Sequence, residues 1–585
     1  MKKIIPIIIG CALFAACSDN YLDRLPETSI GESQEFFNSE SGLQTYSNVF
    51  YSYVDWGSVT NDQSSDNCEH ATSPASIHRG DIWTLPTAQG SNGWSWTQLR
   101  TINYFLEKLE ASTVSESVKT QYRALARFFR AIFYFNKVKA FGDVPWYDQV
   151  IGSQDEALLN KARDPRETVM ANVIADLNYA CDNLPAVKYR NKISKYTALA
   201  WKSRICLFEG TWQKYRGGNG NTYLQEAANA AQQIMSAGVY KLYSTGHPKT
   251  DFRNMFLARS VSTDEVIQAY SWQTAAYHAY TAFFTVASRG QFGATRSLVN
   301  DFDMADGTSF YDAYPDAETR DKMLFGQECA NRDPRLAQCI VTPGYIRAGS
   351  TAVSHTGDFS QNRTGYQICK RVGPATEEDQ GDNRDQIIIR YAEVLLNYAE
   401  AKAELGTLTQ GDVDATINVI RARVGLPGRT LPFVASEAQK KMYTRTTDEN
   451  IMEVRRERRV ELAFEGFRYD DIRRWNEGHL FREKYEGIYV PALGQPFDMD
   501  GDGANDLCIT ANGQLPAAAD RQAGVFYFEL QASNGLSNGN SGRFIPYTAA
   551  VTAWRDWEYL SAIPTEEITL NPALTQNPGW SEMLK

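Results

Sequence analysis

The sequence predicts a mostly α-helical protein, built as a helical-repeat scaffold with an irregular, loop-rich part inserted between its helices. Up to residue 240, long segments carry apolar residues at helical spacing and follow one another as pairs of similar length. Such pairs, without a strict sequence repeat, are typical of a helical solenoid. Between residues 241 and 385 turn residues, aromatic residues and short β-like runs replace the helical period, which returns at Ile387.

The chain begins with a segment that is typical of a secretory leader. Two lysines precede an apolar run at residues 4–14, and two alanines then lead to Cys17. The run is too short to span a bilayer, which needs about 20 apolar residues. A cysteine at this point is similar to a bacterial lipobox, although Phe14 stands where leucine is usual. We therefore expect removal of residues 1–16 and lipidation of Cys17; the alternative is an ordinary secretory signal with a chance cysteine.

Residues 17–585 are interpreted as one domain of three parts. These are helical pairs at 17–240, an irregular ligand-binding part at 241–385, and C-terminal helices with a tail at 386–585. No stretch rich in proline, glycine or serine separates two halves of the sequence. The composition is globular, with 43% hydrophobic residues, 22% charged residues and a net charge of −11. This acidity argues against nucleic acid as a partner, because phosphate binding requires a basic face.

The individual helices are predicted from apolar periodicity and from the residues that end it. In chain order they lie at residues 34–53, 94–109, 117–141, 165–184, 195–215, 223–237, 387–405 and 412–424. Gly142 and Gly238 directly follow two of them, as glycine commonly does after a helix. Residues 265–270 form a β-like run in the irregular part.

Residues 451–475 combine many charges with an apolar stripe at helical spacing. We expect a helix that ends at Gly466, followed by a short second helix at 469–475. Because arginine and glutamate interleave with large apolar residues, we predict a partly buried ionic network in which Arg458 and Glu461 are buried and paired. The alternative is a solvated helix held by surface salt bridges.

Three long segments of the chain carry a family resemblance. They read RALARFFRAIFYFNKVKAFGDVPW at 123–146, ERRVELAFEGFRYDDIRRW at 457–475 and YLSAIPTEEITLNPALTQNPGW at 559–580. In content and order they resemble the SusD/RagB family of outer-membrane nutrient-binding lipoproteins. Residues 18–20, Ser-Asp-Asn, are also similar to the export signal of surface lipoproteins in Bacteroidetes.

The resemblance implies a fold, a function and a partner. The fold is a scaffold of tetratricopeptide-like helix pairs. The function is capture of a glycan by a lipid-anchored protein on the surface of the outer membrane, without catalysis. The partner is a SusC-type TonB-dependent outer-membrane transporter, to which the glycan is delivered. Two alternatives stay open, namely a surface lipoprotein that binds peptides or another nutrient, and a glycan-cleaving enzyme.

The sequence offers no catalytic motif that would favour the enzyme. HExxH, GxxxxGK[ST] and GxGxxG are all absent. Residues 535–539 match GxSxG, but a nucleophile elbow needs a helix after it, and the following residues are typical of a loop. The six histidines show no metal-ligand spacing.

One acidic loop has the spacing of a metal site. Asp498, Asp500, Asp502 and Asp506 fit the pattern DxDxDGxxD, in which alternating carboxylates can surround a hard cation. Ile509 stands where an EF-hand needs glutamate, so the pattern predicts a short structural Ca²⁺ loop. An Asp/Gly-rich turn without metal is the alternative.

Aromatic residues in loop-like sequence are the candidate sugar ligands, because sugars stack their apolar faces on aromatic rings. Trp83 lies in one such stretch, and Trp272, Tyr277 and Tyr280 lie in another; Arg79 and Asp66 are candidate polar neighbours. The acidity of the chain favours a neutral or weakly charged oligosaccharide, although a local basic patch can override net charge.

Overall fold

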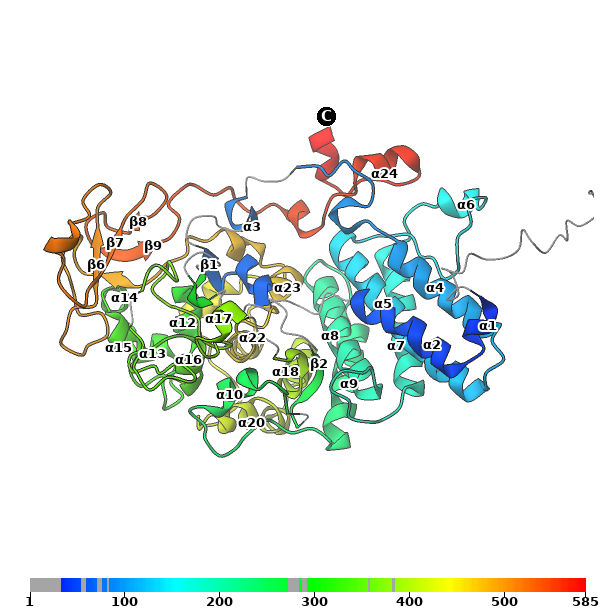
Figure 1. Ribbon diagram of the computed structural model, residues 1–585, viewed down its shortest axis with the longest axis horizontal. Helices are drawn as coiled ribbons and strands as arrows, with labels where there is room; N and C mark the ends of the chain where they lie inside the picture. Colours follow the sequence, from blue (N-terminus) through cyan, green and yellow to red (C-terminus); the bar gives the residue numbers. More distant parts are fainter. Residues whose placement is uncertain are drawn as a thin grey trace, which may run out of the picture.

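The computed structural model describes residues 33–53, 59–70, 76–80, 84–262, 264–271, 284–286, 292–355, 358–380 and 384–584. Most elements are helices, and the strands are short. Figure 1 shows the N-terminal helices stacked at one end of the molecule and the late strands, in orange, at the other. No helix within these ranges is both long and apolar enough to cross a bilayer. Cys17 lies outside the described residues.

The N-terminal part is a stack of packed helices. Its elements are α1 (Gln34–Phe37), α2 (Glu40–Ser47), η3 (Asn48–Tyr53), η4 (Val59–Ser64), β1 (Cys68–His70), α3 (Ser76–Arg79), η5 (Ser91–Gly93), α4 (Thr97–Glu110), α5 (Glu116–Phe141), α6 (Glu156–Leu159), α7 (Arg166–Asn183), α8 (Lys195–Lys214) and α9 (Asn221–Ala237). Each long helix packs on the next, α4 on α5, α5 on α7, α7 on α8 and α8 on α9. One hydrophobic core runs through them, and Phe105, Phe129 and Leu177 are buried in it.

The long predicted helices are present with nearly the expected ends. α5 begins where the Ser115 hydroxyl accepts the N–H of Val118 at 3.5 Å, and it ends at Gly142, whose φ is 75°. The predicted helix at 34–53 is instead broken into α1, α2 and η3. The break follows from Ser39, whose hydroxyl accepts the N–H of Gly42 at 3.1 Å and so begins a new helix.

The middle part consists of short elements. They are α10 (Asp251–Leu257), β2 (Val266–Tyr270), β3 (Phe292–Ala294), α12 (Arg296–Asp301), α13 (Phe310–Ala313), α14 (Ala317–Asp321), α15 (Phe325–Cys329), α16 (Pro334–Cys339) and α17 (Glu377–Gln380). β3 pairs antiparallel with β1 of the N-terminal part. β2 pairs antiparallel with β4 (Gln386–Arg390), so strands join this part to the elements on both sides of it.

The start of the predicted helix at 387–405 is wrong. Its first residues form β4, which is buried along its whole length, and the helix α18 (Tyr391–Glu404) begins only after it. The run Ile387–Ile388–Ile389 is apolar on every side, as a strand covered on both faces requires, and β2 supplies its backbone partners. The predicted helix at 412–424 is likewise split at Thr416 into α19 (Gln410–Ala415) and α20 (Ile417–Arg423).

The C-terminal part contains the remaining helices and a group of short strands. The elements are α21 (Glu437–Met442), α22 (Glu449–Glu461), α23 (Arg468–Arg474), η6 (Gly478–Arg482), β5 (Tyr489–Val490), β6 (Leu507–Thr510), η7 (Ala518–Asp520), β7 (Phe526–Glu529), β8 (Gly535–Leu536), β9 (Gly542–Ile545), η8 (Asp556–Tyr559), α24 (Thr565–Leu570) and η9 (Trp580–Leu584). β6 and β7 pair in parallel, whereas β9 pairs antiparallel with β5 and β8. The strand β9 rather than a helix follows the GxSxG match at 535–539, which removes its resemblance to a nucleophile elbow.

α22 is a charged helix in the interior of the protein. Every residue from Ile451 to Glu461 is buried, which confirms the buried ionic network. Arg458 and Glu461 are not partners of each other, however. Arg458 pairs with Asp471 at 2.9 Å, and Glu461 contacts three other arginines. The helix also ends before Gly466, with Leu462 as its C-cap.

Candidate functional site

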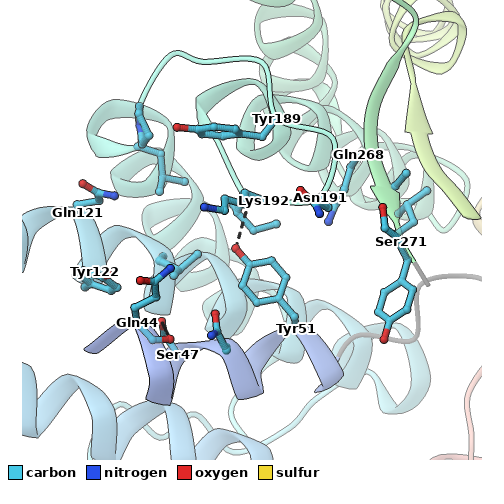
Figure 2. Close-up of a pocket in the computed structure, with 18 residues that line it drawn as sticks. Gln44, Ser47, Tyr51, Gln121, Tyr122, Tyr189, Asn191, Lys192, Gln268 and Ser271 are labelled. Atoms are coloured by element: carbon cyan, nitrogen blue, oxygen red, sulfur yellow. Dashed lines mark hydrogen bonds between the residues drawn. The ribbon is translucent and has the colours of Figure 1, made fainter. Parts of the chain in front are cut away.

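A pocket of about 420 Å³ opens where the N-terminal helices meet the β2–β4 pair (Figure 2). Its walls come from α2, η3, α5, the loop between α7 and α8, and the end of β2. The polar lining consists of four tyrosines, five side-chain amides, two serines and one lysine: Tyr51, Tyr122, Tyr189, Tyr270, Gln44, Asn48, Gln121, Asn191, Gln268, Ser47, Ser271 and Lys192. We call this site the tyrosine–amide pocket.

Backbone contacts hold the loop between α7 and α8 against its neighbours. The N–H of Ile193 donates to the hydroxyl of Tyr51 at 3.2 Å, which Figure 2 marks with a dashed line. The N–H of Ala269 in β2 donates to the carbonyl of Arg190 at 2.7 Å. The loop is therefore fastened to η3 on one side and to β2 on the other, which places its side chains over the pocket.

The pocket differs in charge from the chain as a whole. Among the described residues that line it, none is an aspartate or glutamate, and Lys192 alone carries a charge. The Lys192 ammonium lies 5.9 Å from the centre of the Tyr189 ring. Burial raises the pKa of Tyr51, and burial together with the nearby charge of Glu40 raises the pKa of Tyr122. Both phenols are therefore neutral hydroxyl groups at physiological pH.

Gln268 is oriented by a buried tryptophan behind it. The indole Nε1–H of Trp201 donates to Gln268 Oε1 at 2.8 Å, and both side chains are buried. An indole N–H can only donate, so the amide oxygen of Gln268 must face Trp201. The amino group of Gln268 is thereby left for the pocket that the residue lines.

The aromatic residues predicted from sequence lie outside the described residues. This holds for Trp83, Trp272, Tyr277 and Tyr280, so their role as sugar ligands stays a prediction. Ser271, which directly precedes Trp272, does line the tyrosine–amide pocket.

Asp66 is not a surface partner for a ligand. It is 1% exposed and pairs with Arg468 at 2.7 Å and with Arg459 at 3.0 Å. Burial alone would raise the pKa of Asp66, but these two guanidinium groups lower it below its usual range. Arg79, its predicted companion, lies half-buried at the end of α3.

Two further pockets have a different character. One, of about 400 Å³, lies between α4, α6 and α24 and is lined mainly by apolar side chains such as Trp96, Leu158 and Leu159. The other, of about 230 Å³, contains the buried pair Glu69 and His78, whose side chains approach to 3.3 Å. Neither gathers tyrosines and amides as the first pocket does.

Three of the four predicted metal ligands lie together in the loop before β6. Carboxylate oxygens of Asp498, Asp500 and Asp506 all lie within 4.8 Å of one another. Ca²⁺ binds such oxygens at about 2.3–2.6 Å, so one ion between them would reach all three. Asp502 is exposed and stands outside this group, and its side chain accepts the N–H of Ala504 at 2.8 Å.

Backbone amides also shape this acidic loop. Asp506 Oδ2 accepts the N–H groups of Met499 at 2.8 Å and Asp500 at 3.2 Å. Burial raises the pKa of Asp506, and the neighbouring Asp500 adds to the rise. Gly501 and Gly503 have φ values of 89° and 90°, which only glycine adopts readily, so the turn depends on both.

The sequence reasoning missed the tyrosine–amide pocket itself. The four tyrosines are far apart in the chain and come from four different segments: Tyr51 from η3, Tyr122 from α5, Tyr189 from the loop between α7 and α8, and Tyr270 from β2. Gln121 beside Tyr122 gives no signal of its own, because it is one of many polar residues in α5. The meeting of these segments, however, follows from tertiary packing alone.

Comparisons with known proteins agree over nearly the whole chain. The family model described as SusD family matches residues 263–580, and one described as "Starch-binding associating with outer membrane" matches residues 20–207. A SusD-like protein of Bacteroides ovatus is 23% identical over 501 residues, which are 81% of this chain and 82% of that protein. SusD-like protein P2 of Formosa agariphila is 26% identical over 515 residues, 82% of this chain and 92% of its own.

Solved structures show the same fold. A SusD-like protein from Bacteroides fragilis has a TM-score of 0.67 at 24% identity, covering 95% of this chain and 100% of its own. A SusD-like carbohydrate binding protein from the same species has a TM-score of 0.65 at 23% identity, covering 92% and 100%. The mostly helical architecture predicted from sequence is thus confirmed. Because the first family model matches more than half of its length, the chain belongs to the SusD family.

Proposed function

We propose that this protein is a glycan-binding lipoprotein of the outer membrane and that it binds oligosaccharide in the tyrosine–amide pocket. The observation that carries the proposal is the composition of this pocket, in which four tyrosines and five side-chain amides line about 420 Å³. Ligand pockets in proteins usually measure about 300–1,000 Å³. Tyrosine rings offer stacking faces for sugars, while amides can both donate to and accept from sugar hydroxyl groups. The family to which the chain belongs supports the same class of ligand.

The chemistry of the pocket favours binding without catalysis. Glycoside hydrolysis usually requires two carboxyl groups on either side of the scissile bond. The described residues that line the pocket include neither aspartate nor glutamate, so they cannot serve as the acid and the base of such a reaction.

The proposed setting follows from the N-terminus and the family. Lipid on Cys17 would hold the protein at the outer membrane, and the family model for residues 20–207 describes association with that membrane. We further propose that the protein delivers its glycan to a SusC-type TonB-dependent transporter. Copurification of such a transporter with the tagged protein, from membranes of the native host, tests this partner.

Calorimetry tests the glycan site. The protein is titrated with a panel of oligosaccharides, and Tyr189→Ala is titrated with each one that binds. Tyr189 lies on a loop and is half-buried, so its removal should cost stacking without unfolding the protein. We expect binding to weaken about tenfold, as for the loss of one aromatic contact of about 1–1.5 kcal/mol. Circular dichroism verifies the fold of the variant.

A matched control separates this pocket from the apolar one. Leu159 is 47% exposed and lines the pocket between α4 and α6, so Leu159→Ala should bind glycan like the parent. If Tyr189→Ala binds like the parent while Leu159→Ala does not, the glycan site lies in the other pocket. Reducing ends are assayed in the same samples, and their release by the parent would contradict a non-catalytic role.

We also propose a structural Ca²⁺ ion in the loop at residues 498–506. The support is the approach of Asp498, Asp500 and Asp506 to within 4.8 Å, since three carboxylates at this distance repel one another unless a cation or protons intervene. An ion there would link this loop to the start of β6. Its proposed role is to stabilise the fold, not to bind glycan.

A further inference from the structure

We propose that the tyrosine–amide pocket binds an acidic sugar, with the amino group of Gln268 and the ammonium group of Lys192 donating to its carboxylate or sulfate oxygens. This inference rests on the proposed function, because it names the class of glycan that the same pocket takes. It concerns one acidic residue in an otherwise uncharged oligosaccharide.

The first argument is the fixed orientation of Gln268. Its side chain is 3% exposed, and its oxygen is occupied by the indole N–H of Trp201 at 2.8 Å. Its amino group has no hydrogen-bond partner among the described residues, and the residue lines the pocket. This donor is therefore available to an acceptor that the ligand brings.

Turning the amide does not remove the need for an acceptor. If Gln268 turned its amino group towards Trp201, two donors would face each other and the indole N–H would lose its partner. In every low-energy state, Gln268 therefore presents a hydrogen-bond donor to a ligand in the pocket. A sugar hydroxyl could accept one hydrogen bond here, but an oxyanion accepts several and forms stronger, charge-assisted bonds.

The second argument is the unmatched charge of Lys192. This residue lies on the loop between α7 and α8 and forms no ion pair with the described residues; its recorded contact is with the Tyr189 ring. Figure 2 shows Lys192 and Asn191 on this loop and Gln268 beside β2, all three around the pocket. An ammonium group can only donate, so it adds a second donor and a positive charge to the pocket.

The third argument is that no carboxylate group among the described lining residues would compete with an acidic ligand for these donors. The chain carries a net charge of −11, yet no carboxylate lines the pocket among the described residues. Glu40, exposed at the start of α2, contributes to the raised pKa of the lining residue Tyr122 but does not itself line the pocket. Ser271 adds a buried hydroxyl that lacks a hydrogen-bond partner within the described residues. A local field of this kind selects a charged ligand even when the whole protein is acidic.

The test compares matched pairs of oligosaccharides. The panel contains uronate-bearing and sialate-bearing oligosaccharides, each with its carboxyl methyl ester, and sulfated oligosaccharides with their desulfated forms. The two members of each pair differ only at the acidic group, so the ratio of their dissociation constants reports recognition of that group. We expect at least one acidic member to bind about tenfold more tightly than its neutral partner, as for one charge-assisted hydrogen bond. Added salt should reduce this ratio.

Variants locate the recognition. Lys192→Met should reduce the ratio about tenfold, whereas Lys192→Arg should retain it. Lys195→Met changes the net charge equally, but Lys195 does not line the pocket, so the ratio should stay close to that of the parent. Gln268→Glu keeps an oxygen for Trp201 and places a negative charge in the pocket. This variant should weaken binding of the acidic oligosaccharide far more than binding of its neutral partner.

The outcomes separate this inference from the proposed function. If neutral glycans bind with the Tyr189 dependence described above but no pair favours its acidic member, the inference is wrong and the glycan site stands. The same conclusion follows if Lys192→Met and Lys195→Met have equal effects. If no glycan of either kind binds, the proposed function fails and the inference fails with it. Comparing the sulfated pairs with the carboxylated pairs shows which of the two oxyanions the pocket prefers.

Discussion

Glu461 is a fully buried carboxylate shared by three arginines. Its oxygens lie 2.6 Å from Arg423, 2.7 Å from Arg390 and 3.0 Å from Arg335. Burial alone would raise the pKa of Glu461, but these guanidinium groups lower it to about 2. The charge is therefore part of the folded state throughout the physiological pH range.

We predict that Glu461→Gln destabilises the protein by about 3–5 kcal/mol, because it leaves buried arginines without their shared counter-charge. Urea unfolding at pH 7 measures the loss. The control is Glu318→Gln, which breaks the exposed Glu318–Lys322 pair and should cost less than about 1 kcal/mol. Equal losses in the two variants would contradict the assignment of Glu461 as a central ionic residue.

The same carboxylate sets a pH dependence. Since the pKa of Glu461 is lower in the folded state than its ordinary value of 4.5, its stabilisation is present above about pH 4.5. It is lost as the pH falls towards 2. The difference in unfolding free energy between the parent and Glu461→Gln should therefore shrink over this acidic range.

Ionisation of Asp62 affects stability in the opposite direction from ionisation of Glu461. Its Oδ1 lacks a hydrogen-bond partner among the described residues, and its Oδ2 accepts the N–H of Gly466 at 3.3 Å. Burial is the main cause that raises the pKa of Asp62 from 3.8 to about 7. The folded protein binds this proton more tightly than the unfolded chain, so the carboxyl increasingly destabilises the fold as the pH rises from about 4 to about 7.

We predict that Asp62→Asn stabilises the protein at pH 8, on the order of 2 kcal/mol, and has little effect at pH 4. Thermal melts across this range measure the effect. A variant that is less stable than the parent at pH 8 would show that the charged form of Asp62 is favoured in the fold.

At the scale of elements, the sequence predicts long helices well and their interruptions poorly. The predicted helix at 117–141 differs by one residue from α5 (Glu116–Phe141), because apolar spacing, a serine cap and Gly142 agree there. The apolar period predicts a helix at β4, because the partner strand β2 lies far away in sequence. Gly466 predicts a later end for α22, but the helix already reaches its C-cap at Leu462, and Phe464 adopts a positive φ of 61° in the turn that follows.

The acidic loop at residues 498–506 gives a prediction at this scale. If Ca²⁺ binds only the folded loop, it stabilises the protein by RT ln(1 + [L]/Kd), about 2.7 kcal/mol at a hundredfold excess over Kd. The melting temperature should therefore be a few degrees lower in EDTA than in Ca²⁺. Asp506→Asn should abolish the difference, since the amide oxygen can still accept the Met499 N–H while the charge is gone.

Asp502→Asn is the matched control for this loop. It removes the same charge from a neighbouring exposed residue that stands outside the group of three carboxylates, so most of the Ca²⁺ effect should persist. Identical melting curves of the parent in EDTA and in Ca²⁺, without copurified metal, would show that the loop is a turn held by backbone amides alone.

At the scale of the whole molecule, the sequence determines the fold class more fully than the site. Helix pairs and family motifs cover most of the chain and give the architecture. The pocket, in contrast, combines Tyr51, Tyr122, Tyr189 and Gln268 from four separate segments. The orientation of Gln268 depends on Trp201, a buried residue of α8 that lies 67 positions earlier in the chain. Side-chain amides at such a meeting point leave no periodic signal, whereas aromatic residues in loop-like sequence stand out and are therefore what the sequence predicts as ligands.

The attachment of the molecule to the membrane is expected to depend on Cys17. We expect acyl chains on this cysteine to provide the anchor, because it follows an apolar leader and two alanines. Each buried methylene contributes about 0.8 kcal/mol, and several chains together give stable attachment. We predict that Cys17→Ala leaves the protein soluble or mislocalised, whereas Cys11→Ala, the same change within the apolar leader, leaves it anchored. Fractionation of membranes and protease digestion of intact cells measure both; Cys17→Ala remaining in the outer membrane at the parent level, accessible to protease, would contradict the lipid anchor.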